Sequence, residues 1–137
     1  MTHDLFTAWL AMEEPSLQEL LREMPELADT GWTPEALPIL ERAALERWPS
    51  PDIAPAGDDG AVWGRLLRAI GRTYIDTING AMWVCVPLLQ PTGGAKLVPV
   101  LDVPGMPVWI EVSELIDRML LERSGNVLTS AFDLAAP

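Results

Sequence analysis

The feature that most constrains the fold is a change of hydrophobic period at Asn79-Gly80. In residues 61–78 apolar side chains recur at helical spacing, which predicts a long amphipathic helix. After the Asn-Gly pair the sequence "AMWVCVPLL" is strand-like, and "KLVPVLDV" follows it across the turn-rich link "QPTGGA". The chain is therefore predicted to pass from a central helix, ended by a left-handed residue, directly into a β-hairpin.

Two prolines limit the predicted sheet. Pro87 and Pro99 each lack the backbone N–H that a ladder hydrogen bond requires. The strands that contain them are therefore expected to be short, bulged or at a sheet edge. Cys85, the only cysteine, lies on the first strand and is expected to be a passive, buried apolar side chain.

The segment after the hairpin contains one clear helix and two further elements. The sequence "VWIEV", residues 108–112, is a candidate third strand. Ser113 predicts the N-cap of an amphipathic helix over residues 114–123, with Gly125 just beyond its end. Residues 126–134 fit either a short helix or a strand.

Two short helices are predicted at the N-terminus. Thr2 can cap a helix over residues 4–12, which Pro15 would end. In "SLQELLREM" Ser16 and Glu19 have the spacing of a capping box, so a second helix is expected to begin there. We expect these two helices to form a hairpin.

The clearest helix start in the chain precedes a third helix. Thr33 is its predicted N-cap, Pro34 occupies the first helical position and Glu35 lies in the first turn. The helix is expected to end near Trp48. Residues 49–60 are rich in proline, glycine and aspartate, which indicates a surface connector.

Together these elements predict one α+β domain over residues 1–137. N-terminal helices and a long central helix would pack on a small antiparallel sheet, with an amphipathic helix at the C-terminal end. Residues 1–48 form an acidic helical part, residues 49–60 the connector, and residues 61–137 a helix-sheet-helix part. Neither half has enough apolar surface to fold comfortably alone.

Charge is concentrated in the first half of the chain. Residues 1–59 contain 13 acidic and 3 basic side chains and residues 60–137 contain 7 and 6, so the total of −11 divides into −10 and −1. Such a field repels nucleic acid and anionic membranes, and it favours either solubility alone or a basic protein partner. Because the sequence also lacks a signal-peptide pattern and a long apolar run, we expect a soluble, cytoplasmic protein.

The side chains that most enzymes use for catalysis are scarce. His3 is the only histidine and lies beside the start methionine, so neither a Ser-His-Asp nor a Cys-His arrangement is expected. A metal site built from histidines and cysteines is excluded for the same reason. The glycines of "PTGGAK" link two strands, which is not the context of a phosphate-binding loop. We therefore expect no enzymatic activity, no cofactor and no metal.

The acidic half is interpreted as a protein-binding surface of the immunity or inhibitor type. Trp32 lies in the loop before the third helix and is expected to be the most exposed of the six tryptophans. The expected partner is a basic protein, for example a toxin. The residues predicted to contact it are Glu23, Glu26, Asp29, Trp32 and Glu35.

A row of arginines on the central helix allows two interpretations. Arg65, Arg68 and Arg72 lie three and four residues apart, and Asp76 continues the row. In the structural interpretation they pair with glutamates of the first three helices and with Asp76. In the functional one they form a site for a small molecule, nucleotide or other anion, because guanidinium groups suit carboxylates and phosphates. This site is the alternative to protein binding.

Three segments resemble a group of small, acidic, uncharacterised bacterial proteins that is common in actinobacteria. They are "TGWTPEALPILERAALERWPSP", "GRLLRAIGRTYIDTINGAMWV" and "VSELIDRMLLERSGNVLTSAF". The features that the chain shares with this group are a helix of the pattern W-T-x-E-x-L-x-x-L-E followed by proline, a strand with tryptophan and a C-terminal amphipathic helix. After Tyr74 this chain has Ile75, Asp76 and Thr77 where the group tends to have glycine and glutamate. The resemblance implies no activity; by analogy, some proteins of this size are immunity or antitoxin partners of toxins.

Overall fold

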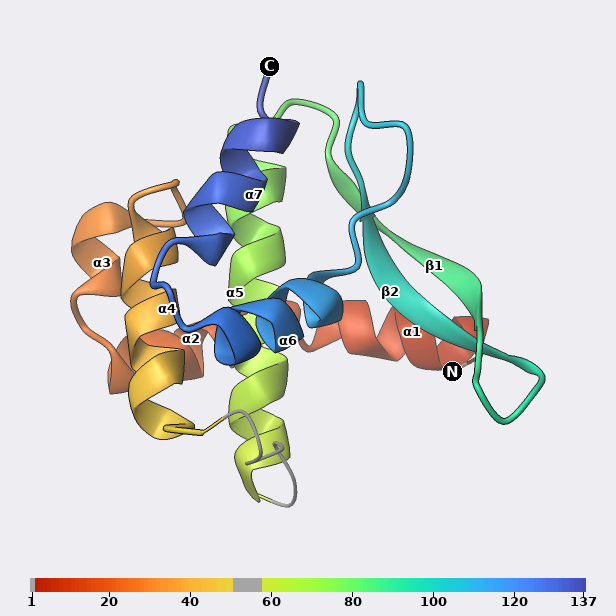
Figure 1. Ribbon diagram of the computed structural model, residues 1–137, viewed down its shortest axis with the longest axis horizontal. Helices are drawn as coiled ribbons and strands as arrows, with labels where there is room; N and C mark the ends of the chain where they lie inside the picture. The colour runs from red at the N-terminus through yellow and green to blue at the C-terminus, as the bar shows by residue number, and fades with distance from the viewer. Residues whose placement is uncertain (1, 51–57) are drawn as a thin grey trace.

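The fold combines helices with one small sheet (Figure 1). The computed structural model describes residues 2–50 and 58–137, and side chains of the second range from residue 60 onwards. The helices are α1 (His3–Ala11), α2 (Glu13–Glu23), α3 (Leu27–Thr30), α4 (Ala36–Arg47), α5 (Asp58–Thr77), α6 (Val112–Glu122) and α7 (Val127–Ala135). The strands β1 (Met82–Leu89) and β2 (Ala95–Asp102) form the antiparallel sheet. The predicted α+β class is confirmed.

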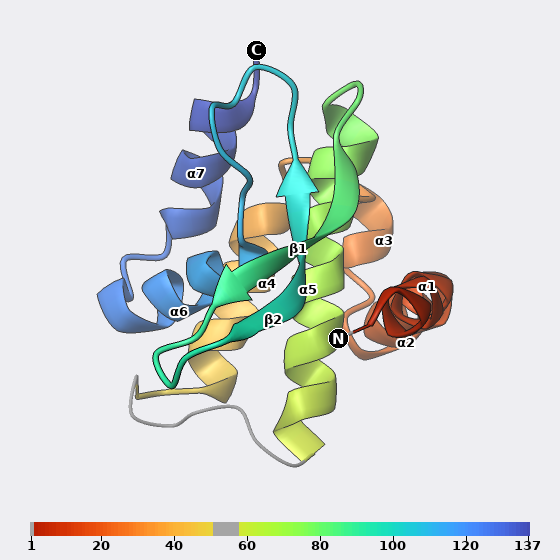
Figure 2. The same ribbon diagram turned by 90° about the vertical axis from the view of Figure 1, so that its right-hand side faces the viewer.

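Helix α5 is the centre around which the other elements are arranged. Figure 2 shows the hairpin lying across one side of α5, with α1 and α2 on one flank and α6 and α7 on the other. A single apolar cluster draws side chains from α2 to α7 and from both strands, so the acidic half and the sheet half share one core. Tyr74 of α5 exemplifies this, since its buried ring meets Phe132 of α7 edge-on at 5.0 Å.

The predicted change from helix to strand is confirmed. Helix α5 ends at Thr77, Gly80 has a φ of +89°, and β1 begins two residues later. A φ in this range suits glycine because other residues meet a steric penalty there. The start of α5 is earlier than predicted, so residues 58–60 of the expected connector are helical; residues 51–57 lie outside the described residues.

The backbone nitrogen of each hairpin proline faces away from the partner strand, so the N–H that proline lacks would not have joined the ladder. Leu101 exchanges both of its backbone hydrogen bonds with Ile110, at 2.8 and 2.9 Å, so its polar groups point away from β1. Pro99 lies two residues away and has the same orientation. Leu97 lies two residues before Pro99 in β2, so its polar groups also point away from β1. Pro87 is the residue of β1 opposite Leu97, and the nitrogen of Pro87 therefore faces the outer edge of β1. The expectation of edge strands is thus correct.

The third strand expected at residues 108–112 does not form. Among the described residues only Ile110 pairs with the sheet, as an isolated bridge to Leu101. The reason is that α6 begins at Val112, which leaves too few extended residues for a strand. Ser113 does not cap this helix, because its hydroxyl donates to Glu111 Oε1 at 3.1 Å instead.

Arg123, and not Gly125, provides the left-handed residue that ends α6. Its φ is +55°, and its backbone N–H bonds to the carbonyl of Met119. The guanidinium then donates to the carbonyls of Leu45 and Trp48 at 2.8 and 2.9 Å. One arginine therefore satisfies carbonyl groups at the C-terminal end of α4 and fixes the end of α6 beside it.

The segment left open between helix and strand is α7, and it begins at a carboxylate supplied by α4. Glu41 is fully buried, and its two oxygens accept from the backbone N–H groups of Val127 and Leu128 at 3.1 and 2.8 Å. The first N–H groups of a helix have no partner within it, and a carboxylate also complements the positive end of the helix dipole.

The predicted N-terminal hairpin is wrong. Helices α1 and α2 follow one another nearly in line, across the direction of α5 (Figures 1 and 2). Pro15 is the third residue of α2, where a missing N–H costs no hydrogen bond, so it does not end a helix. Met12 keeps a right-handed helical conformation between the two helices. Thr2 does cap α1, as expected, by accepting from the N–H of Leu5 at 3.2 Å.

The third predicted helix begins one short turn later than expected. Its helical hydrogen bonding starts at Ala36, and the Thr33 hydroxyl donates to the carbonyl of Thr30 at 2.9 Å instead of capping it. The additional helix α3 precedes this turn. The segment between α2 and α4 therefore contains the short helix α3. Glu26, Asp29 and Glu35 lie on this helix or just beside it in the sequence.

Candidate functional site

The predicted acidic contacts lie on and beside α3. Glu26, Asp29 and Glu35 are exposed, and none of them has an ion-pair partner in the described ranges. Hydrogen bonding with Thr33 and with the backbone lowers the pKa of the Glu35 carboxyl group from its ordinary value. We call Glu26, Asp29 and Glu35 the α3 acidic surface.

The other two predicted contacts take part in intramolecular contacts, Glu23 at the surface and Trp32 against the core. Glu23 pairs with Arg65 of α5, with an N–O distance of 2.7 Å. Trp32 is half-buried and packs against the apolar cluster. The expectation that it is the most exposed tryptophan is wrong, because Trp109, in the loop after β2, is 53% exposed.

The arginine row of α5 meets the helices α1 and α2. The pairing with glutamates that the structural interpretation predicted is found for Arg65 and Arg72, with glutamates of α2 alone, whereas no ion pair to Asp76 forms among the described residues. Besides the Arg65 pair with Glu23, Arg72 pairs with Glu13 at 2.6 Å and with Glu14 at 3.3 Å. Arg68 has no carboxylate within ion-pair distance among the described residues. Its guanidinium lies 4.4 Å from the centre of a Trp9 ring and donates to the Trp9 carbonyl at 3.2 Å.

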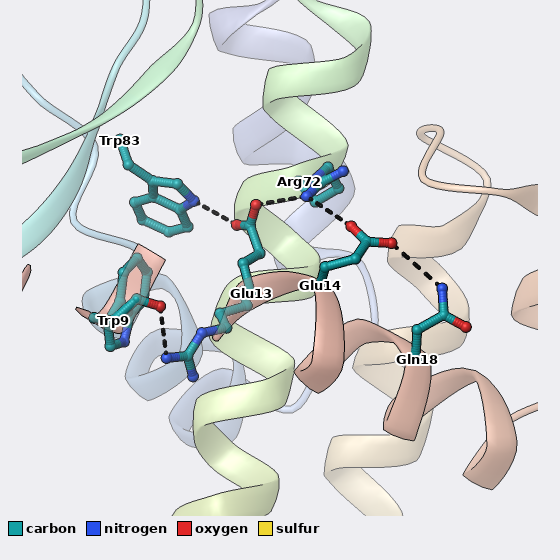
Figure 3. A network of polar contacts seen from close by, with 7 residues as sticks. Trp9, Glu13, Glu14, Gln18, Arg72 and Trp83 are labelled. Carbon is teal, nitrogen blue, oxygen red and sulfur yellow. Dashed lines mark hydrogen bonds and ion pairs between the residues drawn. The ribbon is translucent and has the colours of Figure 1, made fainter. Parts of the chain in front are cut away.

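Glu13 connects three elements in this region (Figure 3). One carboxylate oxygen accepts from Arg72 of α5, and the other accepts from Nε1 of Trp83 in β1 at 2.9 Å. The Trp83 ring in turn meets Trp9 edge-on, with the ring centres 5.0 Å apart. Sequence reasoning missed Glu13 because its partners lie 59 and 70 residues away and no local pattern marks it.

Burial and charge act in opposite directions on the two arginines of this region. Burial lowers the pKa of Arg68, and the nearby charge of Glu13 offsets only part of that effect. Burial alone would also lower the pKa of Arg72, but the hydrogen bond and charge of Glu13 reverse it, and the pKa of Arg72 is raised. Asp76 and Glu14 also contribute to the raised pKa of Arg72, and Glu13 is the carboxylate that acts on both Arg68 and Arg72.

We expect Glu13→Gln to lower the free energy of unfolding by about 1–2 kcal/mol. The side chain is only 12% exposed, so the lost ion pair with Arg72 is poorly screened by water. Glu14→Gln is the matched control, because it removes a carboxylate from the same arginine at a 64% exposed position. It is expected to change stability by less than about 0.5 kcal/mol. Urea unfolding of both variants tests this, and equal effects would contradict a central role for Glu13.

No protein-family model matches the chain, and no match was found among curated proteins or solved structures. The resemblance to small acidic bacterial proteins stays a prediction. No helix in residues 2–50 and 58–137 combines the length and apolarity needed to cross a bilayer. Among the side chains of residues 2–50 and 60–137, no group of three or more His, Cys, Asp or Glu is placed to hold a metal ion. The geometry defines an α+β protein whose arginines largely serve internal contacts.

Proposed function

We propose that the protein is a non-enzymatic protein-binding module of the immunity or inhibitor type. Its partner is a basic protein, for example a toxin, that binds to the α3 acidic surface. The binding is electrostatic in origin: exposed carboxylates accelerate the encounter with a positive surface and select against acidic partners.

The observation that carries the proposal is the unequal use of charged side chains. Six of the arginines form intramolecular contacts to carboxylates or to backbone carbonyls; these are Arg22, Arg65, Arg68, Arg72, Arg118 and Arg123. In contrast, Glu26, Asp29 and Glu35 are exposed and have no ion-pair partner within the described residues. The molecule therefore presents net negative charge at α3 that its own cations do not neutralise.

A charge-reversal experiment tests this proposal. A variant with Glu26→Lys, Asp29→Lys and Glu35→Lys is expected to bind the natural partner about tenfold more weakly, or weaker still. The wild-type complex is expected to dissociate in about 0.5 M sodium chloride, at which exposed charges are largely screened. The measurement is affinity capture from the native cells, followed by quantitative mass spectrometry of the bound proteins.

The matched control reverses three exposed carboxylates elsewhere, at Asp4, Glu114 and Asp133. It changes the net charge of the protein by the same amount and is expected to retain the partner. If both variants lose the partner equally, then net charge and not the α3 acidic surface is responsible. If neither loses it and high salt has no effect, the electrostatic proposal is wrong.

The alternative, an anion site on the arginine row, has one observation in its favour. Arg65 and Arg68 line a cavity of about 400 Å³ between α2 and α5, although Glu19 lines it too. Stabilisation by inorganic phosphate that is lost in Arg68→Gln and kept in Arg118→Gln would support this alternative. Chloride at equal ionic strength is the reference condition.

A further inference from the structure

A second cavity lies where α1, α5, β2 and the start of α6 meet. Its volume is about 380 Å³, within the range of known small-molecule sites. Trp9 and Trp63 provide aromatic walls, and the polar groups around them include Lys96, Glu111 and Ser113. None of these five residues belongs to the α3 acidic surface, so a ligand in this cavity would be independent of the proposed partner binding.

The Trp9 wall is held in place by contacts on its other sides. The guanidinium of Arg68 lies over its ring, and Trp83 meets the ring edge-on with an interplanar angle of 88°. Trp63 comes from the first half of α5, a rigid helix that contacts α2, α4 and α6. A ligand that enters this cavity therefore loses little free energy to ordering its walls.

The cavity contains one carboxylate and one ammonium group that are not paired. Glu111 is half-buried at the N-terminus of α6, where the helix dipole favours a negative charge. Its carboxylate accepts from the Ser113 hydroxyl and has no cation within ion-pair distance in the described part of the chain. Lys96, the only lysine of the chain, likewise has no carboxylate partner there.

This combination of charges selects among ligand classes. A purely anionic ligand that reaches Lys96 would also meet the carboxylate of Glu111, and a purely cationic one would meet Lys96. A zwitterion can instead pair its carboxylate with Lys96 and its ammonium group with Glu111. An apolar or aromatic body on the same molecule would pack against the two indole rings.

We propose that this cavity binds a small zwitterion with an aromatic or large apolar body, of the size and chemistry of a single α-amino acid. The ammonium group lies toward Glu111, the carboxylate toward Lys96, and the side chain against Trp9 and Trp63.

The test uses L-phenylalanine as the probe, because it carries both charges and an aromatic ring and has no indole of its own. Titration is followed by NMR of the tryptophan indole N–H signals, of which those of Trp9 and Trp63 are expected to shift. Phenylacetate and phenethylamine each keep only one of the two charges. Each is expected to bind at least roughly tenfold more weakly than L-phenylalanine, since each lacks one charged contact.

Two variants assign the charged contacts. Lys96→Met and Glu111→Gln are each expected to weaken L-phenylalanine binding by roughly tenfold or more, whereas Glu122→Gln, on the same helix as the Glu111 cap but outside the cavity, leaves it unchanged.

The proposal is overturned if L-phenylalanine shifts neither indole signal at millimolar concentration. It is equally overturned if phenylacetate or phenethylamine binds as tightly as the amino acid, because the zwitterion would then have no advantage. Unchanged affinity in both Lys96→Met and Glu111→Gln would place the ligand elsewhere.

Discussion

Gly71→Ala is expected to lower the free energy of unfolding by about 3 kcal/mol, although the same change usually stabilises a helix interior by about 1 kcal/mol. A Cβ atom at this position would lie 1.9 Å from Cζ2 and 2.5 Å from Cη2 of Trp83. The indole cannot simply move away, because its Nε1 donates to Glu13 and its ring meets Trp9. The clash must therefore displace β1 or α5, and Tm should fall by roughly 10 °C.

Gly64→Ala, two turns earlier on the same helix, is the matched control. The closest atom to its added Cβ would be Nη1 of Arg68 at 3.5 Å, an ordinary contact with a flexible side chain. It is expected to raise stability by up to about 1 kcal/mol, because only the gain in helix propensity remains. The two substitutions should thus have opposite signs in thermal and urea unfolding. If the two substitutions change the free energy of unfolding equally, then Trp83 does not pack closely on Gly71.

Glu41→Ala is expected to cost about 3 kcal/mol and to loosen α7. The substitution leaves the N–H groups of Val127 and Leu128 without their acceptors in a fully buried place, and each unsatisfied group costs about 1–3 kcal/mol. Hydrogen exchange of these two amides should accelerate more than that of amides in α5. Glu41→Gln should fall between the wild type and Glu41→Ala, since the amide keeps one acceptor oxygen but presents N–H groups to a donor.

The control for Glu41 is Glu46→Ala, on the same helix but exposed. Its expected effect on unfolding is within about 0.5 kcal/mol. If Glu41→Ala unfolds at the same urea concentration as the control, then the carboxylate does not hold α7. A fall in stability without faster exchange at Val127 and Leu128 would also contradict this role.

The elements that could be predicted are those specified by neighbouring residues. The change of period at Asn79-Gly80 identified the junction between α5 and β1, and the two prolines identified edge strands. Helix α6 followed from its apolar spacing. In these places local sequence and final structure agree, because burial of one face decides the conformation of a segment by itself.

The elements that could not be predicted depend on side chains from distant parts of the chain. Helix α7 begins at the carboxylate of Glu41, 86 residues before Val127, and α6 ends beside α4 through Arg123. Pro15 has the pattern of a helix end, yet it lies in the first turn of α2, where proline is tolerated. No rule of spacing detects these cases.

The candidate site was predicted only in part for the same reason. The acidic residues Glu26, Asp29 and Glu35 are exposed as expected from their polarity. Glu23 is also exposed but pairs with Arg65 of α5, and Trp32 is half-buried against the core. The two arginine interpretations could be stated from the sequence. Choosing between them depends on the crossing of α1 and α2 over α5, which is a matter of packing between segments.

The outward orientation of Pro87 and Pro99 has a consequence for how the hairpin can meet other chains. A bare edge strand offers a row of donors and acceptors onto which a foreign strand can assemble. Here the outer edge of β1 lacks a donor at Pro87 and the outer edge of β2 lacks one at Pro99, while Ile110 occupies the next position. Each proline removes one donor from an outer edge of the sheet, which disfavours the addition of a foreign strand at that position. Recognition at this end of the molecule is therefore expected to depend mainly on side chains.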